Sequence, residues 1–445
     1  MESYPYKNYK IVDADQLNAD LTSVADAIRI KGKTTASLDF PDGFVVAIDN
    51  IKTGDDAPVA EKDVNFYDYD GTLLHAYTVA EAQALTELPE LPEREGLICQ
   101  GWNWTLEDIK DHNRAVNVGA TYITDDGTTR LYIHLEEGRT SPMLGVCPNG
   151  TVTVDWGDGT TPDTLTGTST STVKWTPNHE YAAPGDYVIK LTVDGEIGMS
   201  GINKSNQYSY ILRHSSSSDE RNYAYYQSLK RVELGGSVTS IGNYFLNYCY
   251  SLDSITIPNG VTSIGDYSFN CCYSLKSVVF PSGVKSVGQY AFAYAHKLKT
   301  VSFPSSVTSI GKNFFYNCYL LDSITIPNGV TSIVNYFLYN CYSLDSITIP
   351  NGVTSIVNNF CPNGYSLKSV VFPSSVTSIE YSAFNCSYSA CYFDFTKHAA
   401  VPTLGSFNAF NMIPDDCEIR VPAALYDEWI AATNWATYAS KIVAV

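Results

Sequence analysis

The 445-residue chain lacks several features that would assign it to a common class of protein. It has no run of about 20 apolar residues, which a membrane-spanning helix needs. Its first residues, MESYPYKNYK, contain neither the basic region nor the apolar core of a secretory signal peptide. We therefore expect no membrane partner, and synthesis in a cytoplasm without export through a signal peptide.

Basic residues are also scarce. The chain has 28 Lys and Arg against 47 Asp and Glu, which gives a formal net charge of −19. An acidic chain repels phosphate backbones, so we do not expect it to bind nucleic acid.

Metal-binding and catalytic motifs are missing as well. The 7 His are scattered and no CxxC pair occurs, so a zinc site is not expected. The 11 Cys are odd in number and follow no small-domain spacing, which argues against a disulfide framework. No Ser/His/Asp arrangement, HExxH motif, phosphate-binding glycine loop or clustered carboxylate pair is present. The sequence predicts a protein that is not an enzyme and needs no cofactor.

Repetition is what the sequence has in abundance. Prolines recur every 23 residues, at Pro258, Pro281, Pro304, Pro327, Pro350 and Pro373. Gly235 takes the equivalent place in a degenerate first unit, and apolar residues keep constant offsets, as Leu344, Ile347 and Ile349 do before their proline. A unit this short cannot bury its own apolar face, so successive units must stack and share one core. The pattern predicts a solenoid of parallel strands that advances by roughly 4.8 Å per unit.

The segment SLDSITIPNGVTSI and its variants through residues 229–395 resemble the BspA-like leucine-rich repeats, found on bacterial surface proteins and in some phage structural proteins. The end of the chain, within residues 396–445, is similar to the segment that closes such arrays. The resemblance implies a mainly β fold in which a leucine-rich-repeat solenoid is followed by a C-terminal cap. The sequence departs from the family in one respect, because Tyr and Asn surround the Cys of each unit where the family usually has small residues.

Ahead of the repeats, GTVTVDWGDGTTPD and HEYAAPGDYVIKLTV resemble a PKD-type β-sandwich. We place this sandwich at residues 149–195 and a connecting segment at residues 196–228. The resemblance implies that Trp156 is a core residue of the sandwich. Asp155 and Asp158 could ligate calcium, but the chemistry of a tight turn also explains them.

The N-terminal part of the chain is predicted to be small and partly helical. Residues 1–54 carry two short helical patterns, and so small a hairpin must pack on copies of itself or on a larger assembly. Residues 64–148 are predicted to be a small mixed α/β region, in which Thr78-x-x-Glu81 and Thr105-x-x-Asp108 have the pattern of capping boxes. Both regions resemble stretches of tail and baseplate proteins of phages that infect Gram-positive gut bacteria.

Tyrosine is the most unusual component of the repeats, and the whole chain has 33. Counted from the proline of a unit, offset 14 carries Cys249, Cys272, Cys318 and Cys341 in four units, and offset 15 carries Tyr or His. We expect the Cys to be buried in reduced form, because free Cys behaves as a small hydrophobe. The residues at offset 15 lie between an inward Cys and an inward Leu, so we expect most of them to point outward along a ribbon about 30 Å long.

Two interpretations of this aromatic row stay open. It is either a stacked ladder that stabilises the turns or a contact surface, because Tyr offers large area at low entropy cost and Asn offers adaptable hydrogen bonds. Sugars suit such a surface, since their C–H faces stack on rings while amides bind hydroxyls. The candidate ligand-binding residues are Tyr248, Tyr250, Tyr273, Tyr294, His296, Tyr316, Tyr319, Tyr339, Tyr342 and Tyr365.

The leading hypothesis from the sequence is a phage virion protein of the tail or baseplate. Its solenoid would bind a glycan or protein of the host surface, and its N-terminal segment would join other tail proteins as a homo-oligomer. The alternatives are a bacterial cell-surface BspA-like adhesin and a depolymerase of surface polysaccharide. The missing signal peptide favours the virion, and the missing carboxylate pair disfavours the depolymerase.

Overall fold

The computed structural model describes residues 64–111, 116–199, 211–213, 228–385, 387 and 392–445. The chain divides into two compact units, residues 1–59 and 60–445, and every described residue belongs to the second unit. Residues 1–54, with the two helical patterns predicted to dock on copies of the chain or on a larger assembly, therefore lie outside the described residues. Among the helices that are described, none is long and apolar enough to cross a membrane.

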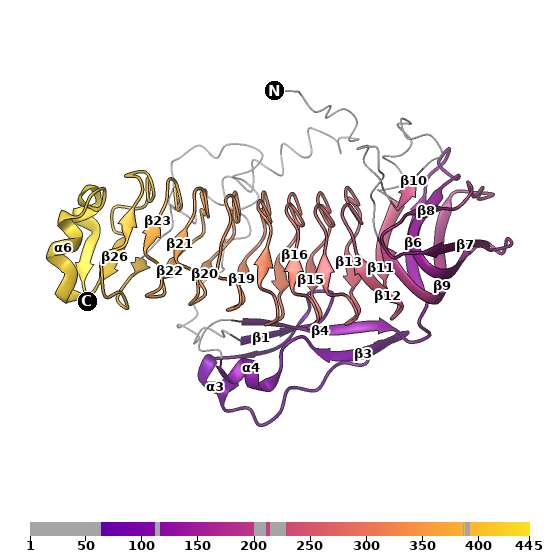
Figure 1. Cartoon of the computed structure of the whole chain (residues 1–445), viewed down its shortest axis with the longest axis horizontal. Coiled ribbons are helices and arrows are strands. Elements are labelled where there is room, and N and C mark those ends of the chain that lie inside the picture. Colours follow the sequence, from indigo (N-terminus) through magenta and orange to yellow (C-terminus); the bar gives the residue numbers. More distant parts are fainter. Residues whose placement is uncertain (1–63, 112–115, 200–210, 214–227, 386, 388–391) are drawn as a thin grey trace, which may run out of the picture. The chain divides into compact units, whose positions relative to one another are not determined.

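A β-solenoid dominates the second unit (Figure 1). One of its sides, the strand face, consists of parallel strands one unit apart: β11 (Leu229–Glu233), β13 (Ser254–Thr256), β15 (Ser277–Val279), β17 (Thr300–Ser302), β19 (Ser323–Thr325), β20 (Ser346–Thr348), β22 (Ser369–Val371) and β24 (Tyr392–Asp394). The middle residue of each three-residue strand, such as Ile255 or Ile347, points inward and is buried, as is Val232 of β11. The predicted fold class, mainly β with a solenoid of 23-residue units, is confirmed.

A second parallel sheet forms another side of the solenoid. Its strands are β12 (Val238–Ile241), β14 (Ser263–Ile264), β16 (Ser286–Val287), β18 (Ser309–Ile310), β21 (Ser355–Ile356), β23 (Ser378–Ile379) and β25 (Thr403–Leu404). Gly288 and Gly311 follow β16 and β18 and donate backbone hydrogen bonds to the preceding unit, an approach so close that a Cβ at Gly288 would lie 2.5 Å from the Asp266 nitrogen. Val334 and Val357 replace glycine in the next two units, and in the described chain the second sheet is interrupted between β18 and β21.

Strands from outside the repeats close the N-terminal end of the solenoid. They are β5 (Thr129–Leu135), β6 (Met143–Asp155), β7 (Asp163–Thr168), β8 (Lys174–Trp175), β9 (Gly185–Met199) and β10 (Leu212–Arg213). Strand β5 pairs with β11 and strand β9 pairs with β12, so both sheets of the solenoid continue into this region. The boundaries predicted for a separate sandwich at residues 149–195 fall inside β6 and inside β9. The PKD-type resemblance itself stays a prediction.

The C-terminal segment closes the other end. After β24 the strand face continues with β26 (Glu418–Val421) and β27 (Ile442–Ala444). Between them lie the 3-10 helix η1 (Ala423–Leu425), helix α6 (Tyr426–Ala431) and the 3-10 helix η2 (Trp435–Lys441). Trp429 of α6 and Trp435 of η2 are fully buried against Phe395, which lies just beyond the last repeat strand.

A small domain precedes these strands in the chain. Its sheet has the order β2-β1-β4-β3, made of β1 (Val64–Tyr67), β2 (Leu73–Tyr77), β3 (Leu97–Trp102) and β4 (Val116–Thr124). Helices α3 (Val79–Gln83) and α4 (Leu106–Asp111) accompany it. Both predicted capping boxes are confirmed, since Thr78 and Thr105 each exchange hydrogen bonds with the acidic residue three positions later.

The small domain is docked on the first half of the strand face (Figure 1). The buried Asn103 amide donates to the carbonyls of Phe280 and Ser302, at 3.0 and 3.2 Å, and its oxygen accepts from the Gly119 nitrogen at 2.8 Å. Trp104 donates to the Phe303 carbonyl at 2.6 Å. These bonds satisfy polar groups that the docking removes from water, and they fix the position of the domain over β15 and β17.

Candidate functional site

The third side of the solenoid is the turn edge, which we define as residues 244–250, 267–273, 290–296, 313–319, 336–342 and 359–365. Each of these turns contains two residues with positive φ, at offsets 9 and 13 from the proline position. At offset 9 they are Tyr244, Tyr267, Tyr290, Asn313, Tyr336 and Asn359. At offset 13 they are Tyr248, Cys271, Tyr294, Asn317, Asn340 and Asn363.

The positive φ values serve the stacking of the units. The amides of most of these residues donate to a carbonyl of the following unit, as Tyr294 does to Tyr316 at 2.7 Å and Asn317 to Tyr339 at 2.8 Å. The turn edge is therefore hydrogen-bonded from unit to unit like the two sheets. Asn is well suited to this left-handed conformation, whereas a bulky Tyr is strained in it. The repeated Asn residues of the turns thus follow from backbone geometry, whereas the Tyr residues do not.

This strain predicts a stabilising substitution. Replacing Tyr294 by Asn should raise the free energy of unfolding by about 0.5–1 kcal/mol, because Asn tolerates positive φ with less strain. The new amide would also extend the ladder in which Asn340 donates to Asn317 and Asn363 to Asn340, each at 2.8 Å. Urea unfolding should show the gain for Tyr294→Asn and none for Tyr294→Phe, which keeps the strain. An Asn variant no more stable than the wild type would contradict this account.

The residues at offset 15 form one continuous aromatic stack. The ring centroids of Tyr250, Tyr273, His296, Tyr319, Tyr342 and Tyr365 follow one another at 4.5, 4.6, 4.6, 5.0 and 4.8 Å, with interplanar angles of at most 14°. Shorter stacks run beside it, formed by Tyr244, Tyr267 and Tyr290 and by the pair Tyr316 and Tyr339. The structure brings the predicted residues of the row together as a ladder.

The ladder corrects two details of the sequence interpretation. Tyr342 is only 7% exposed, so it does not point outward, while the other members of the stack are half-buried. Each inner ring also has both faces covered by its neighbours, so sugars cannot stack on those faces. The remaining candidates, Tyr248, Tyr294, Tyr316 and Tyr339, are half-buried beside the stack. Whether these residues bind a ligand stays a prediction.

The cysteines behind the stack have no reactive role in this geometry. Cys249, Cys272, Cys318 and Cys341 are free, and they are buried as expected. Burial raises the pKa of all four thiols, and it raises the pKa of Cys361, in the next unit, to about 12. Because the thiolate is the nucleophile and metal ligand, these groups are inert near neutral pH.

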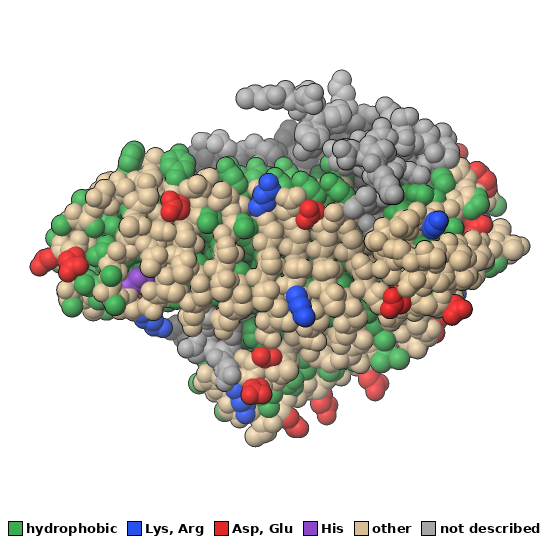
Figure 2. Space-filling view, viewed as in Figure 1, with side chains coloured by type: hydrophobic (Ala, Val, Ile, Leu, Met, Phe, Trp, Pro, Cys, Tyr) green, Lys and Arg blue, Asp and Glu red, His purple; other side chains and the backbone are tan. Residues whose placement is uncertain are grey.

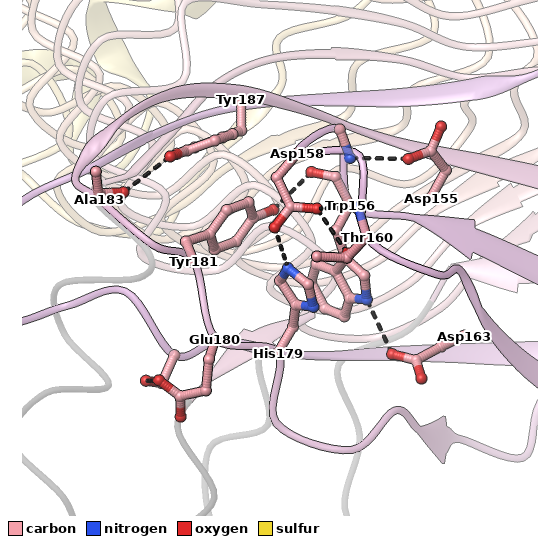
Figure 3. A network of polar contacts seen from close by, with 12 residues as sticks. Asp155, Trp156, Asp158, Thr160, Asp163, His179, Glu180, Tyr181, Ala183 and Tyr187 are labelled. Carbon is pink, nitrogen blue, oxygen red and sulfur yellow. Dashed lines mark hydrogen bonds and ion pairs between the residues drawn. The ribbon is translucent and has the colours of Figure 1, made fainter.

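A second polar cluster lies in the strands at the N-terminal end (Figure 3). Trp156 is buried as predicted, and its ring stacks on His179 with centroids 4.5 Å apart. Asp155 accepts from the Gly157 nitrogen at 2.9 Å, and Asp158 accepts from Thr160 and lies 2.8 Å from His179 Nε2. These bonds hold the turn together, so turn chemistry accounts for both carboxylates. Among the described residues no group of His, Cys, Asp or Glu could hold a metal ion.

Comparison with known proteins identifies the repeats. Residues 203–321 and 262–391 match the family model described as "BspA type Leucine rich repeat region", in 6 copies. No curated protein matches the chain significantly.

Three solved structures of leucine-rich repeat proteins are similar to parts of the chain. The T. pallidum leucine-rich repeat protein is 24% identical, with 35% of this chain and 72% of that chain covered and a TM-score of 0.33. A leucine-rich cell surface protein from Faecalibacterium prausnitzii A2-165 is 25% identical, with 43% and 65% covered and a TM-score of 0.28. A leucine-rich repeat protein from Eubacterium ventriosum ATCC 27560 is 18% identical, with 50% and 92% covered and a TM-score of 0.29. The match to the family model is confined to residues 203–391, less than half of the chain, where it covers most of the repeats.

Proposed function

We propose that this protein is a non-catalytic adhesin that binds a macromolecule of a cell surface through the turn edge of its solenoid. The observation that carries the proposal is the unbroken aromatic stack of six rungs, flanked by Tyr and Asn rows. Tyr-rich surfaces with adaptable amides have the composition of binding surfaces. The match of the repeats to the BspA-type family supports a role at a cell surface.

Binding of the labelled full-length protein to intact cells tests the proposal. Saturable binding is expected to at least one member of a panel of Gram-positive bacteria and cultured epithelial cells. Tyr336→Lys combined with Asn363→Lys should weaken it at least about tenfold, since a lysine ammonium that lacks a partner carboxylate must be desolvated in the interface. Thr354→Lys, at an exposed position outside the turn edge, is the matched control. A folded protein that binds no cell type saturably would refute the adhesin role.

A place in a phage tail is the second proposal. It is supported by the resemblance of residues 1–54 and 64–148 to tail and baseplate proteins. The partners would then be other virion proteins, and the N-terminal segment would form the homo-oligomer. Mass spectrometry distinguishes a protein of the phage particle from a protein on the surface of the producing cell. A virion protein is found in purified particles, whereas an adhesin of the producing cell is released by protease treatment of intact cells.

A depolymerase activity is the third possibility, and the absence of a recognisable carboxylate pair from the sequence disfavours it. Release of reducing ends from a surface polysaccharide by the purified protein would establish an enzyme instead.

A further inference from the structure

Large hydrophobic side chains are exposed where the turns of the solenoid continue beyond the turn edge, on the last repeat and on the cap. Tyr381 is 51% exposed, Phe407 58% and Met412 54%. We call these three residues the C-terminal patch. In the view of Figure 2, hydrophobic side chains project along the edge of the solenoid that lies opposite the small domain, toward its C-terminal end. Phe and Met are usually buried, so this exposure needs a reason.

The three side chains of the patch belong to neighbouring turns. Strand β23 pairs with β25, and beyond these strands the Phe384 amide donates to the Ala409 carbonyl at 2.8 Å. Tyr381 therefore lies on the turn next to the one that carries Phe407 and Met412. One step between units is roughly 4.8 Å, so a single partner can cover all three side chains. A cluster of exposed apolar groups marks an interaction site, whereas isolated ones do not.

The core at this end of the solenoid is closed by other aromatic rings. Phe384 and Phe410 are fully buried, and their rings stack with centroids 5.6 Å apart. In the described chain neither Tyr381 nor Phe407 adds a ring contact to this core. Their apolar surface stays in water, which is unfavourable, and a partner that covers it would remove this cost. The patch therefore has the character of a binding surface rather than of a structural element.

Acidic residues and no basic ones surround the patch. The segments 380–385 and 403–416 contain no Lys, Arg or His and three acidic residues, Glu380, Asp415 and Asp416. Asp415 is paired with Lys441 at 3.3 Å, whereas the other two form no ion pair within the described part of the chain. A cationic group of a partner can therefore approach the rim of the patch without displacing a cation of this chain.

Glu380 lies close to the rings of the patch. It precedes Tyr381 in the chain, and a Cβ at Gly405, two residues before Phe407, would lie 2.6 Å from its Oε2. Its carboxylate is thus held between the two turns that carry the patch.

From these observations we propose that the C-terminal patch binds a basic protein of the cell surface. Apolar side chains of the partner cover Tyr381, Phe407 and Met412, while its Lys or Arg side chains approach Glu380 and Asp416. Aromatic anchors and an adaptable Met are typical of surfaces that bind proteins. This inference rests on the proposed adhesin role, and it names the class of partner.

Two other occupants fit the patch less well. A saccharide would find no hydrogen-bond donor on the side chains of Phe407 and Met412. A second copy of this chain carries the same net charge of −19 and would bring its own carboxylates to an acidic rim. A basic protein surface suits both the apolar centre and the acidic rim.

Phe407→Ser combined with Met412→Ser tests the apolar contact in the full-length protein. Leu73→Ser combined with Ile98→Ser, at residues of the small domain that are 51% and 48% exposed, is the matched control. The probe is the cell type of the panel that binds the wild type, used untreated, after trypsin or after periodate oxidation. We expect the wild type and the control to bind untreated and periodate-treated cells and to lose binding after trypsin. The Phe407/Met412 variant should bind untreated cells at least about tenfold more weakly, with an unchanged melting temperature.

Glu380→Gln combined with Asp416→Asn tests the acidic rim. Raising the salt concentration from about 0.05 to 0.5 M should weaken binding of the wild type several-fold, because salt screens the attraction between the rim and the basic partner. The amide variant should bind more weakly at low salt and depend less on salt. Tyr381→Ala should also weaken cell binding while it leaves stability unchanged, since its ring is exposed.

Three results would overturn the inference. Full cell binding by the folded Phe407/Met412 variant would show that the patch is not the contact. Binding that survives trypsin but not periodate would show a saccharide ligand. A wild type that dimerises in size-exclusion chromatography, and that the two serine substitutions make monomeric, would show that a second copy covers the patch. Each of these results leaves the adhesin role standing, whereas absence of all saturable cell binding removes both proposals.

Discussion

Deleting residues 396–445 should make the protein aggregate. The deletion removes β26, the hydrogen-bonded neighbour of β24, and leaves the last repeat with an open sheet edge. It also removes Trp429, Trp435 and Phe410, which cover Phe395 and Phe384 at the end of the core. Repeat arrays need such terminal caps for solubility. Size-exclusion chromatography with light scattering, at several concentrations, measures the effect.

Deletion of one internal repeat unit serves as the control for this experiment. Removing residues 327–349 takes out one whole unit and leaves both ends closed, so this variant should stay soluble and unfold cooperatively. A soluble, monomeric protein without residues 396–445, with an unchanged melting curve, would contradict the capping role.

The solenoid could be predicted from the sequence because the residues that specify each unit are close together in the chain and recur in every unit. A proline every 23 residues and the apolar residues around it suffice to place strands, core and stacking direction. The burial of the Cys row could be inferred in the same way. The turn edge was only partly predictable, since Tyr is a poor indicator of positive φ. The repeated Asn at offset 13 was the available signal for that conformation.

The docking of the small domain could not be read from any local pattern. The sequence SVV occurs at both β15 and β22, yet Val279 is 5% exposed beneath the small domain and Val371 is 40% exposed. Val279 lies against Gly119 of β4, and Asn103 of the same domain bonds to residues 177 and 199 positions away. The same limit applies to β5 and β9, whose partners lie in the first repeat. A single sequence does not reveal such distant pairings, so it could not indicate that residues 148 and 195 lie within the long strands β6 and β9.

Replacing Tyr342 by Ala should destabilise the solenoid strongly. Its ring is 7% exposed and is stacked between Tyr319 at 5.0 Å and Tyr365 at 4.8 Å. Truncation leaves a cavity in the stack and removes both ring contacts, which should cost about 3 kcal/mol of unfolding free energy. Tyr342→Phe keeps the stack and should lose little of that stability. Tyr381, which is 51% exposed on the last repeat, provides the surface control, since Tyr381→Ala should change stability by less than about 0.5 kcal/mol.

Urea unfolding and cell binding, measured on the same three variants, separate the two roles of the aromatic row. If the stack stabilises the turns, Tyr342→Ala unfolds at lower urea while Tyr342→Phe does not. If the stack also organises the recognition surface, the Ala variant loses cell binding under conditions in which it is still folded, because Tyr319 and Tyr365 no longer have a ring between them. A Tyr342→Ala protein as stable as the wild type would show that the stack is a consequence of the fold and contributes nothing to holding it together.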